Sequence, residues 1–296
     1  MIASDMVRPT ASLLWTFLSF LSIQATAQST NTYVSTKWRD AAEKWEYLPE
    51  ERVLEAAQKG NADAQFWYAR NHEIGALQKN LALSIEWYEK AASRGQPHAQ
   101  WALAWKYRRG EGVKKNPEKE KELFLAAGRT WLVEAEKGDA MTQQVVGMMY
   151  RDGLGFAHDD KEAAKWYLRA AGQGEAGAEI SLAEMYEKGE GVAKDYKEAA
   201  RWYQDLAESD DHNAQYRLGL LYLNGVGLAK DRVEAYKWFW LAAKEELEGW
   251  QYEPAVKSCR DLGPQLTKEE MADANRRVEQ FRKTGFKNRP RSRGWD

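Results

Sequence analysis

Apolar and polar residues recur along this chain in one pattern of about 36 residues, present five times. Each copy opens on a small anchor residue, and a second small residue follows five positions later, directly after a larger apolar one. An aromatic residue comes three positions after the second small residue in all copies but the first. This i, i+3, i+4 spacing predicts an α-helix with one apolar face. The anchors are Ala64, Ala99, Thr142, Ala178 and Ala214.

A second helix is predicted in each copy, because another amphipathic segment follows the first. Its core position carries a bulky pair: Trp87-Tyr88, Leu123-Phe124, Trp166-Tyr167, Trp202-Tyr203 and Trp238-Phe239. Good N-cap residues precede it: Asn80, Asn116, Asp159, Asp195 and Asp231. Glutamates three residues after the last three caps, Glu162, Glu198 and Glu234, predict capping boxes. Glycine pairs end the first helices at Gly110/Gly112, Gly153/Gly155, Gly189/Gly191 and Gly225/Gly227.

The whole pattern, A-x-x-x-L-G-x-x-Y-x-x-G-x-G-V-x-K-D-x-x-x-A-x-x-W-Y-x-x-A-A, resembles the Sel1-like repeat family. The resemblance implies an all-α fold, a right-handed α/α superhelical solenoid of about five helix-turn-helix repeats with helical caps. It also implies, by similarity to tetratricopeptide solenoids, that the first helix of each pair lines a concave side. The first repeat departs from the pattern at His72 and after Gly75, and the second is seven residues longer, with a second helix lengthened through Trp131.

The flanks complete the expected organisation. Residues 28–59 are expected to form an N-terminal helical cap, residues 60–248 the repeat array, and residues 249–281 capping helices in which Thr267 and Glu270 form a capping box. Residues 282–296 are basic and aperiodic, and we expect them to be disordered.

The N-terminus predicts export. An apolar run over residues 11–23 follows Arg8, is too short to span a bilayer comfortably, and ends before Ala25-Thr26-Ala27. Residues 1–27 are therefore expected to be a signal peptide cleaved near Ala27, which places the mature chain in the periplasm or outside the cell. The alternative is an uncleaved membrane anchor.

Composition and charge limit the classes of partner that the chain is expected to bind. The formal net charge of -2 argues against nucleic acid, and the basic tail supports at most weak contact with an anionic surface. The single cysteine, Cys259, can form no intrachain disulfide and is expected to be a small buried residue.

Candidate chemistry is sparse. The four histidines, His72, His98, His158 and His212, lie tens of residues apart, and His72 occupies a core position. No common metal-binding spacing and no activated-nucleophile motif occurs, so we expect no metal, no cofactor and no enzymatic activity. Some Sel1-like proteins have been described as binding or cleaving β-lactams, but they carry cysteine pairs that this chain lacks.

The first helices also carry positions that the repeat pattern does not fix. They lie two, six and nine residues after each anchor, and therefore share one helix face. We expect this face to line a concave groove that binds another protein through Phe66, Arg70, Trp101, Trp105, Arg108, Met148, Arg151, Ile180, Tyr216 and Leu220. The alternative is that these side chains are buried against adjacent repeats.

The sequence thus favours an exported protein-protein interaction scaffold or adaptor. Its partner is expected to be an envelope-located protein, in a signalling or assembly complex. The alternative function is an envelope enzyme or binder that acts on peptidoglycan or a β-lactam.

Overall fold

The computed structural model describes residues 44–45, 48–74, 79–243 and 253–284. All regular secondary structure in these ranges is helical, with thirteen α-helices and one short 3-10 helix. The predicted all-α repeat architecture is confirmed. The predicted signal peptide, the first part of the N-terminal cap and the departures of the first repeat at residues 75–78 lie outside the described residues. Of the tail predicted to be disordered, residues 285–296 also lie outside them, but residues 282–284 are helical, because the last helix continues to Thr284.

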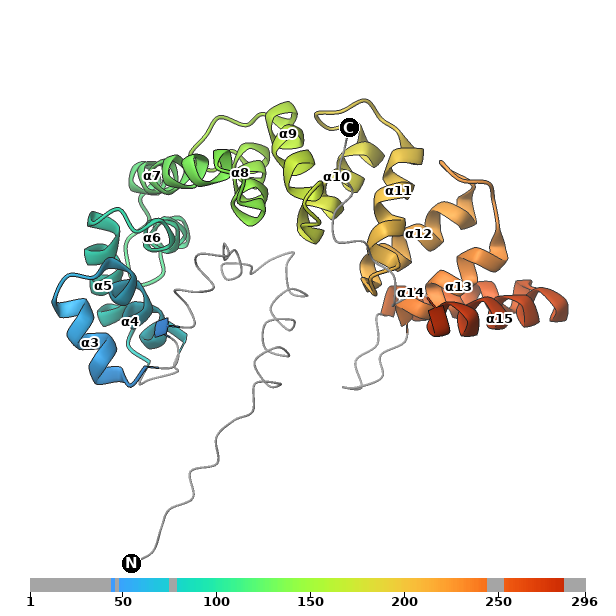
Figure 1. The fold of residues 1–296 in the computed structure, drawn as a ribbon, viewed down its shortest axis with the longest axis horizontal. Helices are drawn as coiled ribbons and strands as arrows, with labels where there is room; N and C mark the ends of the chain where they lie inside the picture. Colours follow the sequence, from blue (N-terminus) through green and yellow to red (C-terminus); the bar gives the residue numbers. More distant parts are fainter. Residues whose placement is uncertain (1–43, 46–47, 75–78, 244–252, 285–296) are drawn as a thin grey trace, which may run out of the picture. The chain divides into compact units, whose positions relative to one another are not determined.

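The chain divides into two compact units, Met1–Trp131 and Leu132–Asp296. Unit 1 contains α3 (Glu50–Gln58), α4 (Ala62–Ile74), α5 (Leu81–Ser93) and α6 (Pro97–Arg109), and the boundary falls within α7 (Pro117–Glu136). Successive helices from α3 to α6 pack against one another. In Figure 1, α3 and α5 lie to the left of the first helices α4 and α6.

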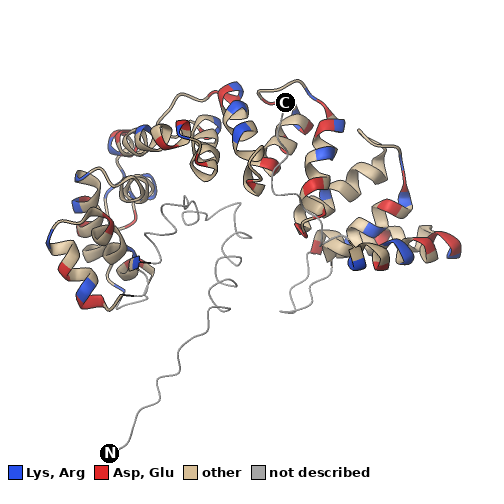
Figure 2. Cartoon of the chain, viewed as in Figure 1, with Lys and Arg blue, Asp and Glu red and all other residues tan. Residues whose placement is uncertain are grey.

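Unit 2 repeats the same hairpin. Its helices are α8 (Ala140–Asp152), α9 (Asp160–Ala171), α10 (Ala176–Lys188), α11 (Tyr196–Ala207), α12 (His212–Asn224) and α13 (Arg232–Ala243), followed by α14 (Glu253–Leu262), η1 (Gly263–Gln265) and α15 (Lys268–Thr284). Each helix from α8 to α13 packs on the next, and α13 also contacts α14 and α15. Basic and acidic residues are interspersed along α15 (Figure 2). Its buried residues are Ala274 and Val278.

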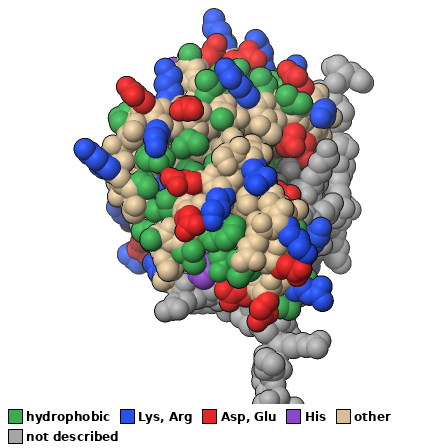
Figure 3. Space-filling model, turned by 90° about the vertical axis from the view of Figure 1, so that its left-hand side faces the viewer, with side chains coloured by type: hydrophobic (Ala, Val, Ile, Leu, Met, Phe, Trp, Pro, Cys, Tyr) green, Lys and Arg blue, Asp and Glu red, His purple; other side chains and the backbone are tan. Residues whose placement is uncertain are grey.

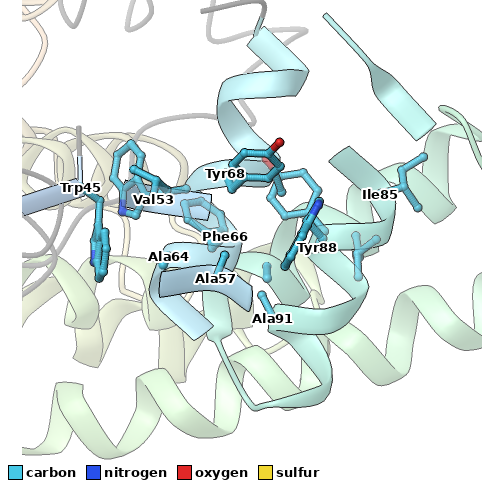
Figure 4. Packing of buried hydrophobic residues seen from close by; sticks show 14 residues of the cluster. Trp45, Val53, Ala57, Ala64, Phe66, Tyr68, Ile85, Tyr88 and Ala91 are labelled. Atoms are coloured by element: carbon cyan, nitrogen blue, oxygen red, sulfur yellow. The ribbon is translucent and has the colours of Figure 1, made fainter. Parts of the chain in front are cut away.

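Small residues bring the helices of a pair together, as the sequence predicts. A Cβ atom on Gly147 would lie 2.9 Å from the Tyr167 ring, and one on Gly219 would lie 2.6 Å from the Phe239 ring. The second-helix aromatic therefore fills the space that the small residue leaves. In unit 1, Tyr88 packs among Phe66, Ile85 and Ala91 in a continuous apolar cluster (Figure 4).

The predicted N-caps are confirmed in all five second helices, because the Asn or Asp side chain accepts a backbone N–H of the first turn. The predicted capping boxes at Glu162, Glu198 and Glu234 are not closed as expected. The N-cap N–H donates instead to the carbonyl of Tyr150, Tyr186 or Tyr222 on the preceding first helix. This carbonyl would otherwise be unsatisfied at the helix end. The box at Thr267 and Glu270 forms as predicted, with both hydrogen bonds present.

A feature absent from the prediction links successive repeats. The residue after each anchor is a buried glutamine in four repeats, and its side-chain amide donates to an alanine carbonyl at the end of the preceding helix. The four glutamines are Gln65, Gln100, Gln143 and Gln215. These bonds satisfy terminal carbonyls and fix the register of one hairpin on the next.

Candidate protein-binding site on the first helices

Two of the predicted groove aromatics in unit 1 belong to the core. Phe66 and Trp101 are each only 7% exposed. The Trp101 ring centre lies 4.8 Å from that of Phe124 and 5.3 Å from that of Trp131. Both side chains are therefore buried against neighbouring residues and are not exposed in a groove. For Trp101 the cause is the length of α7, which carries Trp131 back onto α6.

Trp105 and two arginines on α6 stay partly exposed. The guanidinium carbons of Arg108 and Arg109 lie 4.8 and 5.0 Å from the centre of the half-buried Trp105 ring. Arg108 also donates from Nε to Glu120 Oε1 at 2.7 Å and lies 5.2 Å from the Phe124 ring. Aromatic and guanidinium groups thus share one surface at the end of α6. On the side of unit 1 where α3 to α5 lie, apolar side chains are likewise interspersed with charged ones (Figure 3).

Arg70 occupies the equivalent position to Trp105 on α4. Its guanidinium carbon lies 4.9 Å from the Trp67 ring centre, and its Nε has no hydrogen-bond acceptor among the described residues. One turn further on, Glu73 accepts hydrogen bonds from Tyr88 Oη and Lys106 Nζ, both at 2.6 Å. Burial, together with the Glu73 carboxylate, raises the pKa of Tyr88 well above its ordinary value. The buried Lys106 ammonium thereby ties α6 to α4.

The residues nine positions after each anchor share one structural role. Each contacts the second-helix aromatic of its own repeat: Glu73 bonds Tyr88, Arg108 covers Phe124, Arg151 covers Tyr167, Glu187 bonds Tyr203, and Leu223 packs in the Phe239 cluster. Glu73 and Glu187 accept hydrogen bonds from phenols, Leu223 faces a phenylalanine, and the two arginines lie over a phenylalanine and a tyrosine ring. Arg108 and Arg151 therefore stabilise their own hairpins, whatever else they contact.

In unit 2 the predicted residues differ in exposure. Met148 is 8% exposed and belongs to the core, whereas Arg151, Ile180, Tyr216 and Leu220 are partly exposed. The Arg151 Nε lies 2.8 Å from Asp152. Tyr216 and Leu220 pack on the cluster around Phe239 and Leu262. The partner-binding role of these residues stays a prediction.

The repeat pattern matches Sel1 repeats at residues 62–96, 97–127, 141–175, 176–211 and 212–246, more than half of the chain. The chain belongs to the Sel1 repeat family. Proteins of this family generally mediate protein–protein interactions, and the family is typically non-catalytic.

Similar proteins come from bacteria and a fungus. A protective antigen of uropathogenic Escherichia coli with an SLR fold is 30% identical, with a TM-score of 0.62 over 80% of this chain and 50% of that one. A Sel1 repeat protein from Oxalobacter formigenes is 27% identical, with a TM-score of 0.56 over 84% of this chain and 95% of that one. Chitin synthase regulatory factor 3 of Schizosaccharomyces pombe is 34% identical over 123 residues, which are 40% of this chain and only 13% of that protein.

One contributor to the Sel1 first-helix surface, Arg109, is absent from the sequence-based list. The signal was available, because the second Sel1 repeat alone carries a run of basic residues, RRGEGVKK, around its glycine turn. Lys106 is also absent from that list, and only the structure reveals its buried ion pair with Glu73.

The described residues of the Sel1 repeats show little catalytic chemistry. No three His, Cys, Asp or Glu side chains in the described ranges gather as a metal ion would require. His72 is buried against Tyr68, as expected of a core residue. Burial raises the pKa of the Cys259 thiol to about 12, which makes it a poor nucleophile. No helix within the described ranges is long and apolar enough to cross a membrane.

Proposed function

We propose that this protein is an exported adaptor that binds a segment of another protein on the first helices of unit 1. The binding face consists of Arg70 on α4 and Trp105, Arg108 and Arg109 on α6, and is called here the α4–α6 face. The observation that carries the proposal is the Trp105 ring, which stays half-buried under two arginines while Trp101 beside it is fully packed. Trp and Arg dominate binding hot spots.

Export is the second part of the proposal. It rests on the apolar run at residues 11–23 and on Ala25-Thr26-Ala27. N-terminal sequencing of the protein purified from its native source should read Gln28 as the first residue. A chain that retains Met1 or the apolar run would contradict cleavage.

The partner is then an envelope-located protein whose activity or assembly the adaptor regulates. The name of the fungal relative, a regulatory factor of an enzyme, supports a role exerted on another protein, although this chain spans only 13% of that relative. The family's general role in protein–protein interaction supports it as well.

The binding test uses Trp105→Ala and Trp105→Met in the full mature chain. Trp101 is unsuitable, because replacing a buried Trp by Ala costs about 3–5 kcal/mol and would confuse unfolding with lost binding. Trp105→Met keeps apolar packing on Phe124 but removes the ring. Leu168→Ala on α9, where the side chain is 37% exposed, is the control.

Co-purification from the native envelope should recover a defined partner with the wild-type chain and with Leu168→Ala. Both Trp105 variants should lose the partner while their helical circular-dichroism signal persists. If both variants retained the partner, the α4–α6 face would not be the binding site.

A further inference from the structure

The α4–α6 face carries more positive charge than its own carboxylates neutralise. Among the described residues, Arg70, Lys114 and Lys115 have no ion-pair partner, and Lys114 and Lys115 are exposed in the turn that follows α6. The Arg109 guanidinium lies 3.6 Å from Glu111, in a partly exposed pair. Such pairs contribute about 0–1 kcal/mol, so Arg109 can exchange Glu111 for another carboxylate at little cost.

The nearby carboxylates are already engaged. Glu73 is held at 2.6 Å by both Tyr88 and Lys106, and Glu120 lies 2.7 Å from Arg108. Neither is available to neutralise Arg70 or the lysines of the turn. The face therefore carries positive charge that no carboxylate among its own described residues compensates.

The arginines are also oriented for carboxylates. The guanidinium carbon of Arg70 lies 4.9 Å from the centre of the Trp67 ring, and that of Arg109 lies 5.0 Å from the centre of the Trp105 ring. Packing on a ring restricts a guanidinium and leaves other N–H groups to form charge-assisted hydrogen bonds with a carboxylate. Because the Nε of Arg70 is buried, this arginine would pair through its terminal nitrogens.

The two arginines are held on a rigid frame. The Glu73–Lys106 ion pair joins α4 to α6, with Arg70 about one turn before Glu73 and Arg109 about one turn after Lys106. Because Lys106 is nearly inaccessible to solvent, this junction is shielded from salt. A ligand would meet cations at a fixed spacing, which lowers the entropy lost on binding.

Unit 2 lacks this arrangement. The positions equivalent to Arg70 and Trp105 are occupied there by Met148, Glu184 and Leu220. Arg151, equivalent to Arg108, is paired with Asp152. Arg70, Trp105 and Arg109 are thus particular to the first two repeats, whereas Lys115 occupies the lysine position of the repeat pattern, which Lys194 and Lys230 occupy in unit 2.

We infer that the α4–α6 face binds an acidic peptide segment of the partner, rich in Asp or Glu. Its carboxylates pair with Arg70 and Arg109, and its apolar groups pack on Trp105. This inference rests on the proposed function and specifies the chemistry of the partner.

The test measures fluorescence anisotropy of two labelled ten-residue peptides with the full mature chain. One peptide has eight Glu and two Leu, and the other replaces every Glu by Gln. The face variant is Arg70→Gln with Arg109→Gln. The control, Lys121→Gln with Arg129→Gln, removes the same charge from exposed positions on α7.

The Glu peptide should bind the wild type and the control alike, and its affinity should fall about tenfold or more in the face variant and in high salt. The Gln peptide should not bind. Equal affinity in both variants would overturn the inference, and so would face-dependent binding of anionic phosphatidylglycerol vesicles without binding of the peptide. If the native partner still depends on Trp105 but no variant affects the Glu peptide, the acidic segment is excluded while the adaptor proposal stands.

Discussion

Lys106 shows at the scale of single residues how this fold accommodates a charge in its interior. The side chain is 3% exposed and crosses from α6 to the Glu73 carboxylate, which is itself 33% exposed and also accepts from Tyr88. Removing one partner of a buried pair leaves the other charge uncompensated. Because Glu73 keeps the Tyr88 bond and some solvent, the cost should be smaller than for a fully buried pair.

We predict that Lys106→Met destabilises unit 1 by about 1–3 kcal/mol. Lys59→Met is the matched control, because Lys59 also pairs with a glutamate at 2.6 Å but is 73% exposed. Its effect should stay within about 0.5 kcal/mol. Urea unfolding followed by circular dichroism measures both, and equal midpoints for the two variants would contradict a structural role for the Lys106 pair.

The Cys259 thiol gives a second test at this scale. Cys259 is partly buried rather than fully buried as expected, and this burial raises its pKa to about 12, so the reactive thiolate is suppressed at pH 8. Since Cys259 is the only cysteine in the chain, the rate of reaction with Ellman's reagent reports on this thiol alone. The native protein should react at least about a hundredfold more slowly than the protein in urea. Comparable rates would show that the α13–α14 packing does not enclose the thiol.

At the scale of elements, the glycine turns bring successive repeats into close contact. Gly191 has a φ of +68°, and a Cβ atom on it would lie 2.1 Å from the Asp160 carbonyl oxygen at the start of α9. The turn after one first helix therefore presses on the second helix of the preceding repeat. Gly174 also has a positive φ, +84°, but nothing lies within 4 Å of its Cβ position.

Alanine variants of these two glycines distinguish the cost of a left-handed backbone conformation from the cost of a steric clash. Gly174→Ala should cost about 1–2 kcal/mol, the cost of a left-handed conformation for an L-residue. Gly191→Ala adds a clash with backbone and should cost several kcal/mol or require the α9–α10 packing to shift. Thermal unfolding of both variants is the measurement. A similar loss of Tm in each would mean that the close approach at Gly191 carries no energetic weight.

The elements were largely predictable from the sequence, since helix pairs, N-caps and the small-residue contacts depend on local periodicity. The capping boxes at Glu162, Glu198 and Glu234 were not, because the N-cap amides bond to tyrosine carbonyls of another helix. The exposure of the first-helix residues was not predictable either. Periodicity places Trp101 and Trp105 on one face, but only the structure shows that Phe124 and Trp131 bury Trp101 while Trp105 stays half-buried.

At the scale of the whole molecule, five similar repeats do not make five similar surfaces. The division at Trp131 separates the first two repeats from the last three, a division that the regular pattern does not reveal. The first helices of unit 1 carry arginines that pack on tryptophan rings, whereas unit 2 carries Met148, Glu184 and Leu220 at the positions of Arg70 and Trp105. The family fold thus supplies the framework, and we propose that the variable first-helix positions supply recognition.

The most direct test of protein binding by the α4–α6 face is photo-crosslinking in living cells. p-Benzoylphenylalanine would replace Lys114, in the turn beside Arg109, or Arg129 on α7 as the control; both positions are exposed. The account predicts that irradiation joins one defined partner to the chain labelled at position 114, through an Asp- or Glu-rich segment, and none to the chain labelled at position 129. Absence of a product at position 114, or the same products from both positions, would contradict it.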